Sequence, residues 1–210
     1  MYVINVNIVM KKLLLSLSMI VVVTNLAAQK KLYISGGANI SSFKKDGAGI
    51  HNYVREFNPG FQLGINYQQY KKTKPGFFNG AAQLVMLPVK YDRFYEDAGR
   101  QKNSRPIYLQ LSPNVGLRSN LFKNMGMYGT VGGYVNVMAN FQKNFNYLNA
   151  GLSGSAGIDL SPTWQIAGDY LFGFTDLLSG KEGPAHELYV RSIQLSLRYK
   201  LFEKSNKKAF

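Results

Sequence analysis

The C-terminal part of the chain alternates strictly between apolar and polar residues over residues 188–202. The apolar set is Ile193, Leu195, Leu197, Tyr199 and Leu201, and the polar set between them is Ser192, Gln194, Ser196, Arg198 and Lys200. Because successive side chains of a β-strand point to opposite faces, this pattern predicts a strand with one apolar and one polar face. A soluble antiparallel sheet gives the same pattern, so this strand alone does not separate a soluble protein from a membrane protein.

Seven further segments alternate in the same way, at residues 32–42, 60–70, 77–91, 107–118, 127–141, 148–160 and 164–175. Short and long connections join them in turn, and the long connections are residues 43–58, 92–105 and 176–187. An even number of alternating segments of about ten residues, joined alternately by short and long connections, is typical of an outer-membrane barrel. The sequence therefore predicts an all-β fold, an eight-stranded antiparallel up-and-down transmembrane β-barrel.

Two prolines lie inside the predicted strands. Pro88 is near the far end of segment 77–91, and Pro113 lies on the apolar side of segment 107–118. Proline cannot donate a hydrogen bond to a neighbouring strand. We expect a bulge or the membrane exit at Pro88, and a bulge at Pro113.

A membrane barrel places its apolar residues towards lipid and its polar residues in the lumen. In the closing strand the predicted lipid-facing set is Ile193, Leu195, Leu197, Tyr199 and Leu201. With a periplasmic N-terminus, an aromatic girdle is expected near the periplasmic strand ends, at Tyr67, Trp164, Tyr199 and Phe202. The alternative fold is a soluble lipocalin-like barrel, which requires the reverse orientation of the two sets.

The N-terminus has the order of a secretory signal peptide. Lys11 and Lys12 precede the apolar run 13–23, and Ala27 and Ala28 follow as small residues. Residues 1–29 are therefore expected to be a signal peptide, and residues 30–210 the barrel domain. Met10 offers a natural start, which makes residues 1–9 a candidate mis-called extension. The predicted localisation is the outer membrane.

The composition narrows the possible partners. The absence of cysteine excludes disulfides, thiolate metal sites and a lipid-anchored N-terminal cysteine. Without residues 1–29 the chain keeps 23 basic and 11 acidic residues, a net charge of +12. The basic residues are spread over short turns and termini, without a recognition motif for nucleic acid. Outer-membrane lipid and lipopolysaccharide are the expected counter-charge, and no nucleic-acid partner is expected.

Several segments resemble a known family, the bacterial outer-membrane β-barrel proteins often named PorT-like or porin-family, which are OmpX/OmpA-like eight-stranded barrels. The matching segments are residues 109–117, 127–137, 155–160, 169–177 (DYLFGFTDL) and 195–202. Members usually close with Gly-Tyr-x-Phe, whereas here Arg198 replaces the glycine, Tyr199 is present and Leu201-Phe202 ends the strand. The resemblance implies an outer-membrane location and insertion by the barrel-assembly machinery.

Four charged residues fall on the predicted lumen side: Arg118, Asp159, Asp169 and Arg198. Single charges inside a narrow barrel are costly to desolvate, so these residues are expected to form a paired polar network. The alternative is a gate or a proton path, which the spacing does not distinguish.

The chain offers little to suggest an enzyme. His51 and His186 are the only histidines, and without a carboxylate cluster they make a poor metal site. Ser179, His186 and Glu187 share one loop without a recognisable motif around them. We therefore predict no catalytic residue, no metal site and no cofactor.

Two functions from different classes remain open at this point. The first is an integral outer-membrane barrel with a side-chain-filled lumen and a structural role, or a binding and adhesion role of its loops, which would contact an extracellular ligand or an envelope partner protein. The second is a narrow transport channel or a secretion-system accessory barrel. Eight strands enclose an interior just wide enough for side chains, which favours the first.

Overall fold

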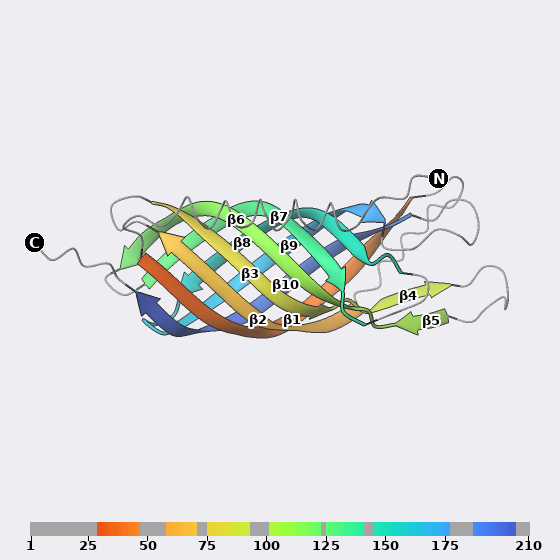
Figure 1. Cartoon of the computed structure of the whole chain (residues 1–210), viewed down its shortest axis with the longest axis horizontal. Coiled ribbons are helices and arrows are strands. Elements are labelled where there is room, and N and C mark those ends of the chain that lie inside the picture. The colour runs from red at the N-terminus through yellow and green to blue at the C-terminus, as the bar shows by residue number, and fades with distance from the viewer. Residues whose placement is uncertain are drawn as a thin grey trace, which may run out of the picture.

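The structure is a computed structural model that describes residues 29–46, 58–70, 75–92, 101–122, 125–140, 145–176 and 187–204 (Figure 1). Residues 1–28 of the predicted signal peptide lie outside the described residues, as do His51, Ser179 and His186. Gln29 is the first residue of the first strand. In the described part of the chain, no helix has the length and hydropathy needed to cross a membrane.

The described residues form ten strands, eight of which close into a barrel. Their bounds are β1 Gln29–Asp46, β2 Asn58–Tyr70, β3 Gly76–Met86, β4 Val89–Asp92, β5 Gln101–Ser104, β6 Ile107–Phe122, β7 Met125–Met138, β8 Leu148–Asp159, β9 Trp164–Asp176 and β10 Glu187–Lys204. The order around the barrel is β1-β10-β9-β8-β7-β6-β3-β2, and every pair is antiparallel. The predicted eight-stranded antiparallel barrel is confirmed.

The two ends of the barrel differ in their connections. At one end, called here the short-turn end, lie the start of β1, the end of β10 and the brief connections β2–β3, β6–β7 and β8–β9. At the other, the long-loop end, lie the connections β1–β2, β3–β6, β7–β8 and β9–β10. The β4–β5 hairpin extends beyond the long-loop end (Figure 1).

The register around the barrel fixes its tilt and width. Hydrogen-bonded partners traced once around the barrel from Lys31 return to β1 ten residues further on, through Gln68, Asn79, Asn114, Gly132, Ser153, Leu171, Ser192 and Ser41. Strand number and this stagger together determine how wide a barrel is, and eight strands leave room for little more than side chains. Contacts inside the lumen are therefore made across a narrow space.

The predicted strand 77–91 is wrong at its far end. β3 ends at Met86, and Val89–Asp92 forms the separate strand β4, which pairs with β5. Part of the predicted loop 92–105 is therefore a strand. The break is at Leu87-Pro88, where a bulge or the membrane exit is predicted from the missing donor of Pro88. The amide of Leu87 donates to the carbonyl of Pro106 at 3.0 Å.

The bulge predicted at Pro113 is also wrong. β6 keeps one register on both sides of the proline, with Leu111 opposite Val135 and Asn114 opposite Gly132 of β7. The ladder of β6 and β7 omits Ser112 and Pro113 without a shift, because a missing donor removes a bond without requiring an extra residue. The register shifts of the described strands lie at Leu32/Tyr33, Tyr189/Arg191 and Asn120/Phe122.

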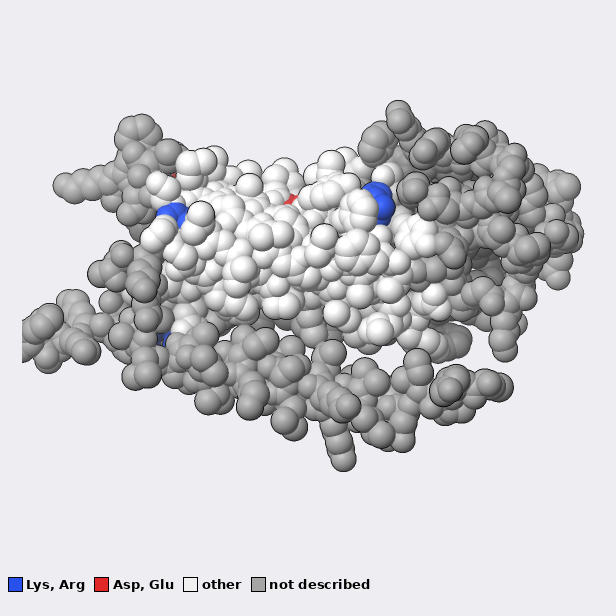
Figure 2. Space-filling model, turned by 90° about the horizontal axis from the view of Figure 1, so that it is seen from above, with Lys and Arg blue, Asp and Glu red and all other residues white. Residues whose placement is uncertain are grey.

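The apolar and polar residues that alternate along the strands lie on opposite faces of the barrel wall. Large apolar side chains are exposed on the outside of every barrel strand, including Ile34, Leu63, Leu84, Val115, Val131, Leu152, Phe174 and Leu195. Polar side chains fill the inside, including Asn39, Gln62, Gln83, Gln110, Asn136, Ser153, Gln165 and Gln194. On the face seen in Figure 2, few charged atoms show among the described residues of the outer wall. This is the reverse of the arrangement that a soluble lipocalin-like barrel requires.

Aromatic side chains cluster on the outer face near the short-turn end. Trp164 at the start of β9 packs against Tyr199 of β10, with ring centroids 4.9 Å apart. Both rings are partly exposed, as is Phe202. These positions agree with those expected for an interfacial aromatic girdle.

Gly37 allows the first and last strands to approach closely where the barrel closes. A Cβ at this position would lie 2.0 Å from the carbonyl oxygen of Leu195 and 2.8 Å from the Cα of Ser196. A Cβ on the preceding residue, Gly36, would meet only the side chain of Leu63, at 3.8 Å. The closing seam between β1 and β10 therefore requires a glycine at position 37 but not at position 36.

We expect Gly37→Val to lower the free energy of unfolding by about 1–3 kcal/mol, the usual cost of overpacking. Gly36→Val is the matched control and should be tolerated, because valine there points to open space on the outer face. The folded fraction in lipid vesicles, measured as the compact band on a gel of unheated samples, gives the comparison. Equal folding of the two variants would show that the seam is not closely packed at Gly37.

Candidate functional site in the barrel interior

Arg198 is the centre of the charged part of the lumen. Its side chain is 1% exposed, and its Nη2 donates to both carboxylate oxygens of Asp169 at 3.3 and 3.2 Å. Its Nη1 donates to the hydroxyl of Tyr128 at 2.7 Å, and its Nε to the hydroxyl of Ser196 at 3.3 Å. Every nitrogen of the guanidinium thus has an acceptor, which is what a buried cation requires.

A second ion pair, Arg118–Asp159, lies nearer the short-turn end. Both side chains are partly exposed, and they meet across β7, the strand between their own strands β6 and β8. The meeting depends on Gly126 of β7, where a Cβ would lie 2.8 Å from Asp159 Oδ2 and 3.0 Å from Arg118 Nη2. The missing side chain makes the space in which the two charges pair.

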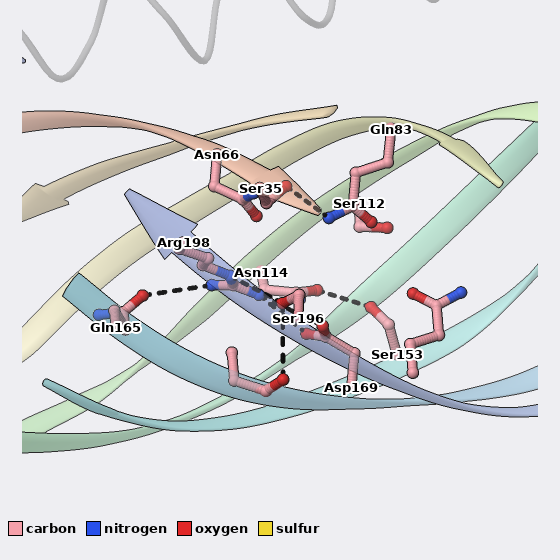
Figure 3. Close-up of polar contacts among 12 residues, drawn as sticks. Ser35, Asn66, Gln83, Ser112, Asn114, Ser153, Gln165, Asp169, Ser196 and Arg198 are labelled. Atoms are coloured by element: carbon pink, nitrogen blue, oxygen red, sulfur yellow. Dashed lines mark hydrogen bonds and ion pairs between the residues drawn. The ribbon is translucent and has the colours of Figure 1, made fainter. Parts of the chain in front are cut away.

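Gln165 connects the two ion pairs. Its Nε2 donates to Asp159 Oδ1 at 2.9 Å, and its Oε1 accepts from Arg198 Nη1 at 3.5 Å and from Gln68 Nε2 at 3.2 Å. The hydroxyl of Tyr128 also donates to this oxygen, at 3.3 Å. The two pairs therefore belong to one hydrogen-bonded network, part of which is seen in Figure 3.

The middle of the lumen contains neutral polar side chains from opposite sides of the barrel (Figure 3). Their hydrogen bonds join strands that are not neighbours: Gln83 of β3 donates to Ser35 of β1 at 3.4 Å, and Gln194 of β10 donates to Gln110 of β6 at 3.2 Å. Ser153 of β8 donates to Asn114 of β6 at 2.7 Å. These bonds occupy the space across which a solute would have to pass.

An apolar cluster, called here the apolar cap, lies at the long-loop end of the lumen. Its members are buried side chains from β3, β6 and β10 and from the segments that follow β3 and β7, namely Val85, Leu87, Tyr108, Phe145 and Val190. Met138 packs against this cluster. Phe145 belongs to the β7–β8 connection and is 3% exposed. The lumen thus has an ionic network towards one end and an apolar cap at the other.

Some buried polar atoms of the described lumen have no protein partner. Both side-chain atoms of Gln62 and of Asn136 are in this state, as is the hydroxyl of Tyr108. Buried polar groups are almost always hydrogen-bonded to protein or to ordered water. Ordered water is the usual partner of such groups when no protein atom is in reach.

All four charged residues proposed from the sequence lie in the lumen, and they form two pairs, Arg118 with Asp159 and Arg198 with Asp169. The proposed outward set of β10 is exposed, and Leu195 is 57% exposed while the neighbouring Gln194 is 0% exposed. Sequence reasoning did not find the connecting roles of Tyr128 and Gln165, nor the apolar cap. The signal for the cap was present, since Val85, Tyr108 and Val190 are apolar residues in polar sets near strand ends.

The candidate residues for catalysis and metal binding do not lie among the described side chains. In that part of the chain, no group of three His, Cys, Asp or Glu residues is placed to hold a metal ion. The loop residues weighed for catalysis or metal binding, His51, Ser179 and His186, lie outside it. The charged side chains of the lumen bind one another.

A closed antiparallel barrel of eight strands with an apolar exterior and a polar, side-chain-filled interior defines a class of protein, the small transmembrane β-barrel. Among solved structures the chain is similar to OprG of Pseudomonas aeruginosa, at 16% identity and a TM-score of 0.49, over 83% of this chain and 96% of that one.

Two further structures are similar at lower scores. Ail, the attachment invasion locus protein of Yersinia pestis, in complex with the heparin analogue sucrose octasulfate, has 14% identity and a TM-score of 0.43 over 81% of this chain and 98% of that one. Neisserial surface protein A has 8% identity and a TM-score of 0.44 over 80% and 96%. No family model and no curated protein matches the sequence. The class therefore rests on the fold and burial of the chain itself, and the PorT-like name stays a resemblance.

Proposed function

We propose that the protein is an integral outer-membrane β-barrel that does not conduct and acts through its long-loop end, in a structural or binding role. Its apolar exterior fits lipid, and its interior is held together by side chains. The observation that carries the proposal is the filling of the lumen by side chains: the Arg198 network, separate cross-barrel hydrogen bonds such as Gln194 to Gln110, and the apolar cap at Phe145. A barrel filled in this way presents its connections as the parts free to meet a partner.

The long-loop end is the proposed binding surface. It includes the β4–β5 hairpin, which stands apart from the barrel sheet. Loops on a rigid scaffold commonly carry binding residues, and here the scaffold is an eight-stranded barrel. An extracellular ligand or an envelope partner protein is the proposed contact of this end, and the barrel-assembly machinery the proposed partner of the strands during insertion. No catalytic role is proposed.

The competing function is a narrow channel or a secretion-system accessory barrel. The unpartnered amides of Gln62 and Asn136 favour it, because they need water inside the barrel. The apolar cap opposes it, since ions and polar solutes would have to pass Val85, Leu87 and Phe145 without hydrogen-bonding partners. Gln62 is the register partner of Val85, so water bound to its amide lies beside the cap, and such isolated water does not make a continuous path past the apolar side chains.

Purified protein should give no stable conductance in planar lipid bilayers. The ionic network and the apolar cap both have to open before ions can cross, and the eight-stranded interior has no room for a parallel path. A porin measured in the same bilayer is the positive control for detection. Reproducible channel openings that depend on the purified protein would contradict the filled-lumen proposal and support the channel.

A further inference from the structure

Arg191 places a cation on the outer wall of the barrel. It is two residues from Ile193 in β10 and alternates with the buried residues Val190 and Ser192, so its side chain leaves the outer face. Its register partners are Phe172 of β9 and Ser42 of β1. These positions lie towards the long-loop end of all three strands.

The guanidinium of Arg191 is held in one orientation. Its Cζ atom lies 3.5 Å from the ring centroid of Phe172, and its Nη1 donates to the carbonyls of Gly173 and Val190, each at 2.9 Å. A stacked guanidinium with one nitrogen fixed to backbone keeps its remaining donors in a fixed direction. Little conformational freedom is left to lose when a ligand binds, which favours affinity.

A cation at this place is exceptional in the described wall. Among the barrel-strand residues whose side chains the structure describes, the other charged ones point into the lumen or lie at the short-turn end. The face seen in Figure 2 shows few charged atoms. No described carboxylate is within ion-pair distance of Arg191. Asp176 and Glu187 follow towards the rim of the same two strands, and their side chains are not among those described.

We propose that Arg191 anchors the phosphate group of an outer-leaflet lipid, the phosphorylated lipid A part of lipopolysaccharide. The proposal rests on the proposed outer-membrane location. The energetic cost of a charge on the lipid face falls towards the headgroups. The planar guanidinium of arginine binds phosphate with two parallel hydrogen bonds. Exposed Phe174, Tyr170 and Ile193 surround it with apolar surface for acyl chains.

The test compares lipid vesicles that differ only in this phosphate. Wild type is folded into three kinds of vesicle: phosphatidylcholine only, phosphatidylcholine with bisphosphorylated lipid A, and phosphatidylcholine with dephosphorylated lipid A. The temperature at which the compact gel band is lost is measured for each. Free inorganic phosphate is added to plain vesicles as a fourth arm. We expect phosphorylated lipid A alone to raise this temperature. Arg191→Gln should abolish the rise or require about tenfold more lipid A, because a charge-assisted hydrogen bond is lost.

Arg105→Gln is the matched control, because Arg105 is an exposed arginine at the same end that precedes β6, and it should keep the full rise. Arg191→Lys retains the positive charge without the planar guanidinium and should keep part of the temperature rise. This variant provides the comparison if Arg191→Gln folds poorly. An equal rise with dephosphorylated lipid A or free phosphate, or a full rise in folded Arg191→Gln, would overturn the proposal. Failure of wild type to fold in plain vesicles would instead contradict the membrane location on which it rests.

Discussion

Arg198→Met should destabilise the folded barrel by about 3–5 kcal/mol, the cost of leaving one member of a buried ion pair without its partner. The carboxylate of Asp169 would remain in the lumen without the two hydrogen bonds that Arg198 donates to it, and the hydroxyl of Tyr128 would lose its donor. Urea unfolding in detergent or vesicles, followed by the fluorescence of Trp164, the only tryptophan, measures this loss.

The double variant Arg198→Met/Asp169→Asn separates the lost pair from a general packing defect. Removing the second charge eliminates the buried unpaired carboxylate, so this variant should recover much of the lost stability. Arg118→Met offers a graded comparison, since Arg118 is more exposed than Arg198 while the two carboxylates, Asp159 and Asp169, are about equally exposed. If the double variant is as unstable as Arg198→Met, Arg198 does not stabilise the barrel through its ion pair with Asp169.

The alternation of residue types was enough to predict the barrel and the orientation of its strands. Period two leaves no intermediate register, so Leu195 and Gln194 had to lie on opposite faces. The apolar set was placed outside because eight such segments follow a predicted export signal. The same reasoning placed Arg118, Asp159, Asp169 and Arg198 in the lumen. Strand ends were predicted less well, and most of β4 was included in the preceding strand, although the apolar residues Val89 and Tyr91 are out of phase with its apolar set at Leu84 and Met86.

The pairing inside the lumen could not be obtained from alternation. Arg198 is opposite Gln165 in the register, yet its carboxylate partner Asp169 lies four residues further along β9. Arg118 and Asp159 belong to strands that are not neighbours. Such contacts depend on the stagger of the closed barrel and on gaps such as the one at Gly126, and both follow from all eight strands together.

Leu195→Arg should destabilise the protein in lipid by about 2–4 kcal/mol, because it places a cation on the lipid face close to the bilayer midplane. Leu195 is near the middle of β10 and is 57% exposed, so a water-soluble barrel would tolerate arginine there with a change of roughly 0.5 kcal/mol or less. Leu201 lies on the same face of the same strand near the short-turn end. Arginine at that position should cost only about 0–1 kcal/mol, since its charge reaches the interface.

The comparison of Leu195→Arg with Leu201→Arg in lipid vesicles tests the membrane barrel most directly. The folded fraction is read from the compact band of unheated samples over a series of urea concentrations, with Leu195→Phe as the apolar control at the central position. For a membrane-spanning barrel, the folded fraction falls strongly in Leu195→Arg, slightly in Leu201→Arg and almost not at all in Leu195→Phe. Equal folding of both arginine variants, or stable folding of either one in water without lipid or detergent, would contradict it.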